Sequence, residues 1–332
     1  MTIDKIRISV GSASVLGLYH KEFEIPPTTC YLMTYKEGHC LANCGFCPQS
    51  RDSSSSSGRL SRIIWPVYSF KELTTKLKYL PPTKRFQRIC IQTLNYPDNI
   101  KDLIEIISEI KTVSSTPISV AIPPTNKDNL KKLKFKGVER VGIALDAATP
   151  ELFKNIKGEG AQGPYTWEGH YQALKDAIDI FSEGSISTHL IVGLGEKEQE
   201  MIERIENLNQ MNVLISLFAF MPVKGTKLQA LKQPDLLSFR KIQLARHLII
   251  TEHKSLKDFT FNSKGKLINI NLNKLDLRKI TDTGDAFLTS GCKGCNRPYY
   301  TSRPSGPMYN FPRKLNQQEK DEIYTQLLRF VR

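Results

Sequence analysis

The chain has 332 residues, 40% of them hydrophobic, which is enough to bury the core of one large domain or two ordinary ones, and no apolar run reaches the roughly 18–20 residues of a membrane span. The net charge of +14 favours an acidic partner, but the basic residues are spread over several predicted helices, so nucleic-acid binding is not expected. The first residues lack the layout of a signal peptide, which predicts a cytoplasmic protein whose seven cysteines are metal ligands or redox groups.

Strands and helices are predicted to alternate along the whole chain. Short runs of β-branched and apolar residues predict eight strands, at 28–35, 86–93, 117–122, 138–145, 186–192, 213–220, 259–261 and 285–289. Stretches with helical periodicity lie between or after them, at 70–79, 99–113, 126–135, 165–181, 198–210, 235–253, 271–280 and 317–332. This alternation predicts an α/β fold, a (β/α)8 barrel of the TIM type that is either complete or, because its last strands are weakly patterned, limited to six strands.

The pattern also predicts three parts. An N-terminal extension covers 1–27, the barrel covers 28–290, and a C-terminal tail covers 291–332 with two cysteines and the last helix. In barrels of this kind, functional residues lie on the loops that follow the strands. The loop after the strand at 28–35 is therefore the first candidate site.

Three closely spaced cysteines lie in that loop: Cys40, Cys44 and Cys47. Thiolates at this spacing can bind three irons of a [4Fe–4S] cluster and leave the fourth iron open. A structural zinc site is the alternative, but it would require a fourth ligand near a second short Cys or His pair. The adjacent His39 is not an easy fourth ligand.

The segment Cys40–Cys47, with Phe46 just before its last cysteine, resembles the signature of the radical S-adenosylmethionine (SAM) superfamily. The resemblance implies that the three cysteines hold a [4Fe–4S] cluster, and that the amine and carboxylate of SAM bind its fourth iron. It also implies that Phe46 packs near the adenine and that an external electron donor reduces the cluster.

Four cysteines remain, and they predict a second, auxiliary [4Fe–4S] cluster. Cys292 and Cys295 form a glycine-flanked C-x₂-C pair, and Cys30 and Cys90 lie on neighbouring predicted strands. The alternative for each strand cysteine is that it is a small core residue. Ser305, shortly after the pair, is an alternative ligand.

Several segments resemble biotin synthase: Arg88–Cys90, Leu145–Glu151, Ile191–Glu196 and Val223–Thr226. The resemblance implies that Asp146 accepts hydrogen bonds from the ribose of SAM, although it could instead cap the following helix. It places Asn95, with Tyr96, where the methionine amine binds. Further cofactor-binding residues are Gly193 and Gly195, which either let the backbone approach the adenosyl group or form a turn, and Val223.

The chain departs from biotin synthase at the sulfur-donor cluster, because Ser187 stands where a cysteine is expected and the predicted strand at 117–122 has none. The chain most resembles the archaeal biotin-synthase-like proteins that work in pairs as a split lipoyl synthase. This resemblance implies a sulfurtransferase of lipoate biosynthesis that inserts sulfur into a protein-bound octanoyl chain, with C8 favoured over C6. The implied partners are an acidic lipoyl-carrier domain and the companion protein.

An octanoyl C–H bond is unactivated, so a cofactor must supply the radical that breaks it. The resemblance implies a 5′-deoxyadenosyl radical that removes the hydrogen, after which a sulfide of the second cluster is attacked. Candidate acyl-binding residues are Phe218, Phe220 and Met221; His189 could face the cavity but is expected to be a core residue. Biotin-type sulfur insertion, a radical enzyme without sulfur donation and a zinc-stabilised RNA-binding protein are the alternatives.

Overall fold

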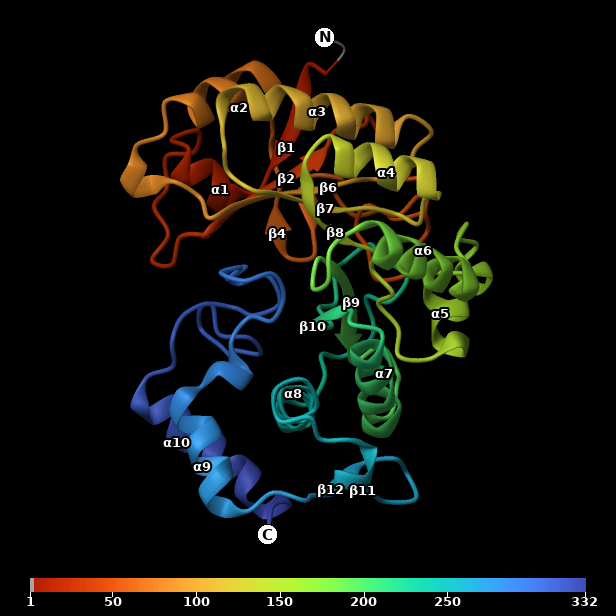
Figure 1. The fold of residues 1–332 in the computed structure, drawn as a ribbon, viewed down its shortest axis with the longest axis vertical. Helices are drawn as coiled ribbons and strands as arrows, with labels where there is room; N and C mark the ends of the chain where they lie inside the picture. Colours follow the sequence, from red (N-terminus) through yellow and green to blue (C-terminus); the bar gives the residue numbers. More distant parts are fainter. Residues whose placement is uncertain (1–2) are drawn as a thin grey trace.

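A mostly parallel, eight-stranded sheet organises the protein, whose computed structural model describes residues 3–332 (Figure 1). The strand order is β10-β9-β8-β7-β6-β2-β1-β5. Six strands are parallel: β2 (Thr29–Thr34), β6 (Arg88–Gln92), β7 (Ile118–Ala121), β8 (Val138–Gly142), β9 (Ile186–Val192) and β10 (Leu214–Ala219). Two antiparallel strands, β1 (Lys5–Ile8) and β5 (Val67–Ser69), extend the β2 side. The predicted α/β fold is confirmed in its incomplete form, since within residues 3–332 no pairing closes β10 onto β5.

The last two predicted barrel strands are wrong. β11 (Phe259–Phe261) pairs with β12 (Leu267–Ile270) in a separate antiparallel hairpin. The segment Asp285–Phe287 is a turn of 3₁₀ helix, which follows directly on Gly284 in the left-handed conformation. The apolar residues of these short runs fill the core beside the sheet, so their hydrophobicity reflects burial and not a strand of the main sheet.

Most helices begin where the sequence predicts, and a side-chain cap usually marks the start. Asn126, Thr166, Asp235, Asn273 and Asn316 each accept a hydrogen bond from the backbone N–H three residues further on. The helices are α1 (Val10–Val15), α2 (Phe70–Lys78), α3 (Asn99–Val113), α4 (Lys127–Phe135), α5 (Pro150–Ile156), α6 (Trp167–Ile180), α7 (Glu198–Gln210), α8 (Leu236–Thr251), α9 (Lys274–Thr283) and α10 (Gln317–Leu327). In Figure 1, α2, α3 and α4 lie side by side over one face of the sheet.

Alternation along the strands separates a helix-facing core from a cavity. On β6, Ile89 and Ile91 belong to the large core beneath the helices, while Cys90 and Gln92 line a cavity on the other face. The same alternation on β2 puts Leu32 in the core and Tyr31 at the cavity.

The C-terminal segment crosses the open side of the sheet. Ser290 accepts a hydrogen bond from the backbone N–H of Leu217 in β10 (2.8 Å), and Asn296 accepts one from Thr28 just before β2 (3.0 Å). Arg62, in the hairpin of β3 (Arg59–Leu60) and β4 (Ile63–Ile64), donates to the carbonyl of Tyr299 (3.0 Å). The segment that carries Cys292 and Cys295 is thereby fixed across the sheet, between β10 and β2, the two outermost parallel strands.

Candidate functional site

The three-cysteine loop follows β2 and is held by its own backbone and by the loop after β6. The N–H of Cys40 donates to the carbonyl of Gln49 (2.8 Å), and that of Cys47 donates to the carbonyl of Cys44 (3.0 Å). Leu41 donates to the carbonyl of Asn95 (2.9 Å). These backbone hydrogen bonds fix the shape of the loop.

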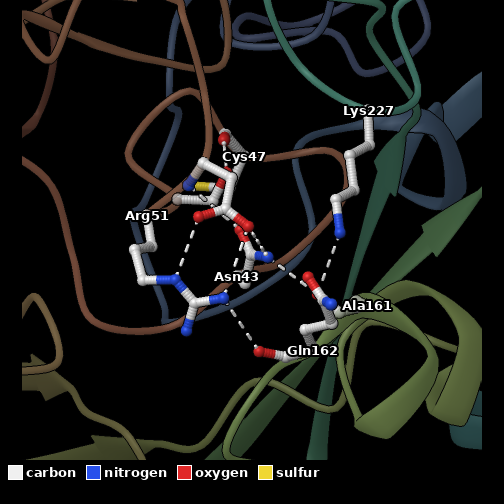
Figure 2. Close-up of polar contacts among 8 residues, drawn as sticks. Asn43, Cys47, Arg51, Ala161, Gln162 and Lys227 are labelled. Atoms are coloured by element: carbon white, nitrogen blue, oxygen red, sulfur yellow. Dashed lines mark hydrogen bonds and ion pairs between the residues drawn. The ribbon is translucent and has the colours of Figure 1, made fainter.

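Asn43 ties this loop to the segment that follows α5 (Figure 2). Its amide, which is 1% exposed, donates to Asp52 (2.7 Å) and to the carbonyl of Ala161 (2.8 Å). Lys227 donates to the same carbonyl (3.0 Å), and Arg51 pairs with Asp52 (3.0 Å). An Asn between two cysteines carries no pattern in the sequence, so this bracing role was not predicted.

Burial raises the pKa of the three thiols, to about 12 for Cys44. Two local features act the other way. The backbone N–H of Asn95 donates to Sγ of Cys40 (3.1 Å) and lowers its pKa, and the charge of Lys157 lowers the pKa of Cys44. Metal binding to these thiols would displace their protons, because the thiolate is the ligand.

The geometry required to bind a single metal ion differs from that required to bind a cluster. Among residues 3–332, no group of three or more His, Cys, Asp or Glu side chains surrounds one point as a single metal ion requires. In a [4Fe–4S] cluster each thiolate binds its own iron, so the three sulfurs do not have to converge on one point.

Asp146 follows β8 and lines the cavity beside this loop. Its backbone is left-handed (φ +68°), and its carboxylate forms an ion pair with Lys157 (2.7 Å) in which both side chains are less than one-tenth exposed. The cap of α5 is Thr149, whose side chain accepts from Leu152 (3.2 Å), so the interpretation of Asp146 as a helix cap is wrong. Binding of ribose by Asp146 stays a prediction.

Lys157 is the main site residue that the sequence did not reveal. Its ammonium lies 5.4 Å from the ring of Tyr165 and also donates to the carbonyl of Ala144. Tyr165 in turn accepts from the side chain of Asn95 (3.0 Å). One lysine among 47 basic residues has no distinguishing pattern, and only the fold places it beside Cys44.

Three of the remaining cysteines line the same cavity: Cys90, Cys292 and Cys295. The N–H of Cys295 donates to the carbonyl of Cys292 (3.0 Å), and its sulfur lies 3.1 Å from the hydroxyl of Tyr31. Burial raises the pKa of Cys90 to about 12, and the charges of Cys292 and Cys295 add to this increase. The structure thus brings the strand cysteine and the C-terminal pair together.

The structure does not place Cys30 in the cavity with the other three cysteines. Cys30 is fully buried in the core beneath the helices, and within residues 3–332 the cavity lining does not include it. The physical reason is strand alternation: Tyr31 faces Cys90 across the β2–β6 pair, so Cys30 points to the other face. Ser305 is exposed and likewise lies outside this lining among the described residues, and the roles of Cys30 and Ser305 as ligands stay predictions.

The cavity has a volume of about 600 Å³, in the usual range of roughly 300–1,000 Å³ for small-molecule sites. Phe46, Phe218, Phe220 and Met221 line it, and their contacts with a cofactor or an acyl chain stay predictions. His189 also faces it, against the expectation of a core residue, and packs on Phe218 (ring centroids 4.9 Å apart). Burial lowers the pKa of His189 to about 4, so its ring is neutral at physiological pH.

Four other predicted cofactor residues are not part of this lining within residues 3–332, and their roles stay predictions. Tyr96 donates to Asp102 (2.9 Å), and Val223 accepts from the N–H of Thr226 (3.2 Å) in a turn. Gly193 and Gly195 form the turn after β9, with positive φ angles of 102° and 123°. The N–H of Gly193 donates to Glu196 (2.6 Å), which gives this turn a structural role of its own.

The open α/β sheet carries a three-cysteine loop after its first parallel strand, an arrangement suited to an iron–sulfur enzyme. The profile described as the radical SAM superfamily matches residues 38–208, and the chain belongs to this superfamily. Membership removes the zinc-stabilised RNA-binding alternative. Within residues 3–332, none of the helices is long and apolar enough to cross a bilayer.

Curated relatives are biotin synthases at low identity. The enzyme of Methanococcus vannielii is 26% identical to the chain over 67% of the chain and 65% of the enzyme. That of Persephonella marina is also 26% identical, over 61% of the chain and 58% of the enzyme. The chain spans about three fifths of the length of the curated relatives it matches.

Solved structures share the fold. The match to methylornithine synthase covers 71% of this chain and 67% of the methylornithine synthase chain (TM-score 0.52, 15% identity). The match to the FeFe-hydrogenase maturase HydG from Carboxydothermus hydrogenoformans covers 68% of this chain and 52% of the HydG chain (TM-score 0.53, 19% identity).

The superfamily implies a [4Fe–4S] cluster and SAM, and the residues present fit both. Cys40, Cys44 and Cys47 supply three thiols on a braced loop, and the thiol-facing N–H of Asn95 suits a thiolate at Cys40. Cys47 and Asp146 both border the cavity, so a cofactor bound to the cluster would face it.

Proposed function

We propose that the protein is a radical SAM sulfurtransferase, one half of a split lipoyl synthase, which inserts sulfur at C8 of a protein-bound octanoyl chain. The sulfur comes from an auxiliary [4Fe–4S] cluster held by Cys90, Cys292 and Cys295. The observation that carries the proposal is that this second group of cysteines borders the same cavity as Cys47 of the first loop. A radical formed beside Cys47 and a sulfur source at the second group could then act on one bound chain.

The chemistry requires a radical because the octanoyl C–H bonds are unactivated. When bound, the first cluster and SAM supply a carbon radical strong enough to break such a bond. The apolar side chains of Phe218, Phe220 and Met221 would bind the acyl chain and exclude water from the reacting carbon. His189 is neutral in this cavity and packs on Phe218, so its ring adds no charge beside the acyl chain.

The net charge of +14 supports an acidic carrier domain as the macromolecular substrate. The octanoyl-lysine arm of such a domain would enter the cavity, while the companion protein would carry out the second sulfur insertion at C6. An external electron donor would reduce the first cluster. The carrier domain and the companion protein follow from the resemblance to split lipoyl synthases.

Sulfur insertion of the biotin synthase type is the second candidate, favoured by the curated relatives named above. It differs in the substrate, a small molecule in place of a carrier domain. Serine side chains, Ser119 on β7 and Ser187 on β9, face the cavity on either side of β8. A serine is a poorer ligand for a soft metal centre than a cysteine, so the second cysteine group has to be completed from the C-terminal segment instead.

The decisive experiment is mass spectrometry of an octanoyl-lysine peptide after anaerobic incubation with the protein, SAM and a reductant. The expected product carries one added sulfur, and the Cys292→Ala variant should still cleave SAM but add none. Use of the 8-mercapto peptide as substrate distinguishes C8 from C6 insertion. If dethiobiotin gains sulfur and the peptide does not, the second candidate is correct; SAM cleavage without sulfur transfer to either would refute both.

A further inference from the structure

Tyr31 on β2 connects the sheet to the second cysteine group. Strand alternation turns its side chain toward the cavity, and its register partner across the β2–β6 pair is Cys90. Its hydroxyl lies 3.1 Å from Sγ of Cys295 and accepts a hydrogen bond from the backbone N–H of Arg297 (3.0 Å). Tyr31 therefore stands between a cysteine of the sheet and a cysteine of the C-terminal segment.

These two contacts fix the direction of the hydrogen bond to sulfur. The backbone N–H of Arg297 can only donate, so it occupies an acceptor position of the Tyr31 oxygen. The hydroxyl hydrogen is left to point at Cys295. When Cys295 binds a metal it is a thiolate, which accepts hydrogen bonds and donates none, so the phenol is the donor. A hydrogen bond to a charged acceptor is stronger than one between neutral groups.

The surroundings of this hydrogen bond are apolar. Tyr31 is 7% exposed, and Cys90 and Cys295 pack against the small cluster of buried side chains to which it belongs. The other members of this cluster are Met33, Trp65, Leu94 and Tyr96. In such a low-dielectric environment, the hydrogen bond acts more strongly on the charge of the sulfur than it would in water.

The position of the C-terminal pair does not depend on Tyr31 alone. The backbone N–H of Thr28 donates to the side chain of Asn296 (3.0 Å), which in turn donates to the carbonyl of Pro26 (3.0 Å). Thr289 donates to the backbone carbonyl of Asn296 (2.7 Å). Removal of the Tyr31 hydroxyl should therefore leave the segment in place, so that its loss acts on the sulfur and not on the path of the chain.

We propose that Tyr31 is a positioning residue for the second cluster: its hydroxyl donates a hydrogen bond to the Cys295 thiolate and thereby raises the reduction potential of that cluster. The inference rests on the proposed function, since it requires a second cluster. Hydrogen bonds to the sulfurs are among the factors that set the potentials of iron–sulfur clusters. The hydrogen bond stabilises the reduced state more than the oxidised one, because the reduced state carries more negative charge.

A higher potential suits sulfur transfer, in which the second cluster takes up an electron. When the carbon radical attacks a sulfide, its unpaired electron and one electron of a sulfide lone pair form the new C–S bond. The other electron of that pair reduces one iron from ferric to ferrous, so the step requires no further oxidant. Tyr31 favours this uptake because its hydrogen bond offsets part of the added negative charge.

The test measures the reduction potential of the second cluster in the full chain, purified anaerobically, with the three cysteines of the first loop changed to alanine. A redox titration followed by electron paramagnetic resonance of the reduced cluster gives the midpoint potential. Tyr31→Phe removes the hydroxyl and keeps the ring. Tyr309→Phe is the matched control, because Tyr309 is also buried (3% exposed) and its hydroxyl donates to the carbonyl of Pro234 (2.7 Å) and not to a cysteine.

In Tyr31→Phe, the equilibrium constant for reduction of the cluster should fall about tenfold, which corresponds to about 59 mV for one electron. Tyr309→Phe should keep the potential of the parent. Equal potentials for Tyr31→Phe and Tyr309→Phe would overturn the proposal.

Should Tyr31→Phe fail to fold or to bind iron, replacement of Tyr31 by 3-fluorotyrosine takes its place. Fluorine makes the hydroxyl a stronger donor and keeps the phenol, so the potential should rise above that of the parent, and an unchanged or lower potential would overturn the proposal. A parent without iron would refute the second cluster, the proposed function and this inference together. An intact cluster whose potential does not depend on Tyr31 refutes only the role of Tyr31.

Discussion

Replacement of Lys157 by methionine should destabilise the protein strongly, because it leaves the Asp146 carboxylate buried without a counter-ion. The two charged atoms are 2.7 Å apart and both side chains are less than one-tenth exposed. At an effective dielectric constant of about 20, their attraction is about 6 kcal/mol, part of which only offsets the loss of hydration. Removal of one partner of such a pair typically costs about 3–5 kcal/mol, which is the loss we expect for Lys157→Met.

Thermal unfolding of the anaerobically purified protein measures this effect. A loss of about 3 kcal/mol should lower Tm by roughly 6 °C or more. The control is Lys154→Met on α5, whose ion pair with Glu159 (3.2 Å) is solvent-exposed and should contribute less than about 1 kcal/mol. The double variant Lys157→Met with Asp146→Asn should recover most of the loss, since no charge is then left unpaired. Equal Tm values for Lys157→Met and Lys154→Met would refute the reasoning.

Four further predictions follow from the site and its surroundings. Cys30→Ala should keep the iron content of the parent protein, whereas Cys90→Ala should lower it by about half, as an iron assay would show; a loss of iron in Cys30→Ala would contradict the core position of Cys30. Gly193→Ala should lower Tm more than Gly184→Ala, because both glycines have positive φ but only at Gly193 would the new Cβ lie 2.8 Å from Pro234; equal shifts would argue against that contact. His170 and His189 have pKa values lowered by burial to about 2 and about 4, so the unfolded chain binds more protons than the folded one between about pH 6.5 and pH 4, and stability should fall as pH falls through this window. Urea denaturation at several pH values measures the free energy of unfolding, and for His170→Leu its slope against pH in this window should be smaller by about 1.4 kcal/mol per pH unit. An unchanged slope would exclude a neutral buried His170. Binding of an acidic octanoylated carrier domain should weaken on the order of tenfold between low and high salt, measured by calorimetry, and an affinity independent of salt would contradict a role for the net charge.

Local sequence patterns were sufficient for most elements of the fold. The β-branched runs of the first six strands and the capped, amphipathic helices between them can be recognised without tertiary information, because periodicity and caps are properties of neighbouring residues. The strand at 259–261 and the segment at 285–289 have the same local hydrophobicity, yet one forms a separate hairpin and the other a turn. β1 was missed, because a strand of four residues has too few positions for a clear alternation.

The amino-acid sequence alone determined the cysteine loop, because Cys40, Cys44 and Cys47 are neighbours in the chain and their spacing is itself the signal. Only the tertiary structure decided which distant residues join them. The register of β2 against β6 turns Cys30 into the core and Cys90 into the cavity, and a shift by one residue would exchange the two faces. Likewise, the chain path after α5 brings Lys157 to Asp146, and the segment across the open sheet brings Cys292 and Cys295 to Cys90. Such contacts depend on how whole elements pack, which no local pattern encodes.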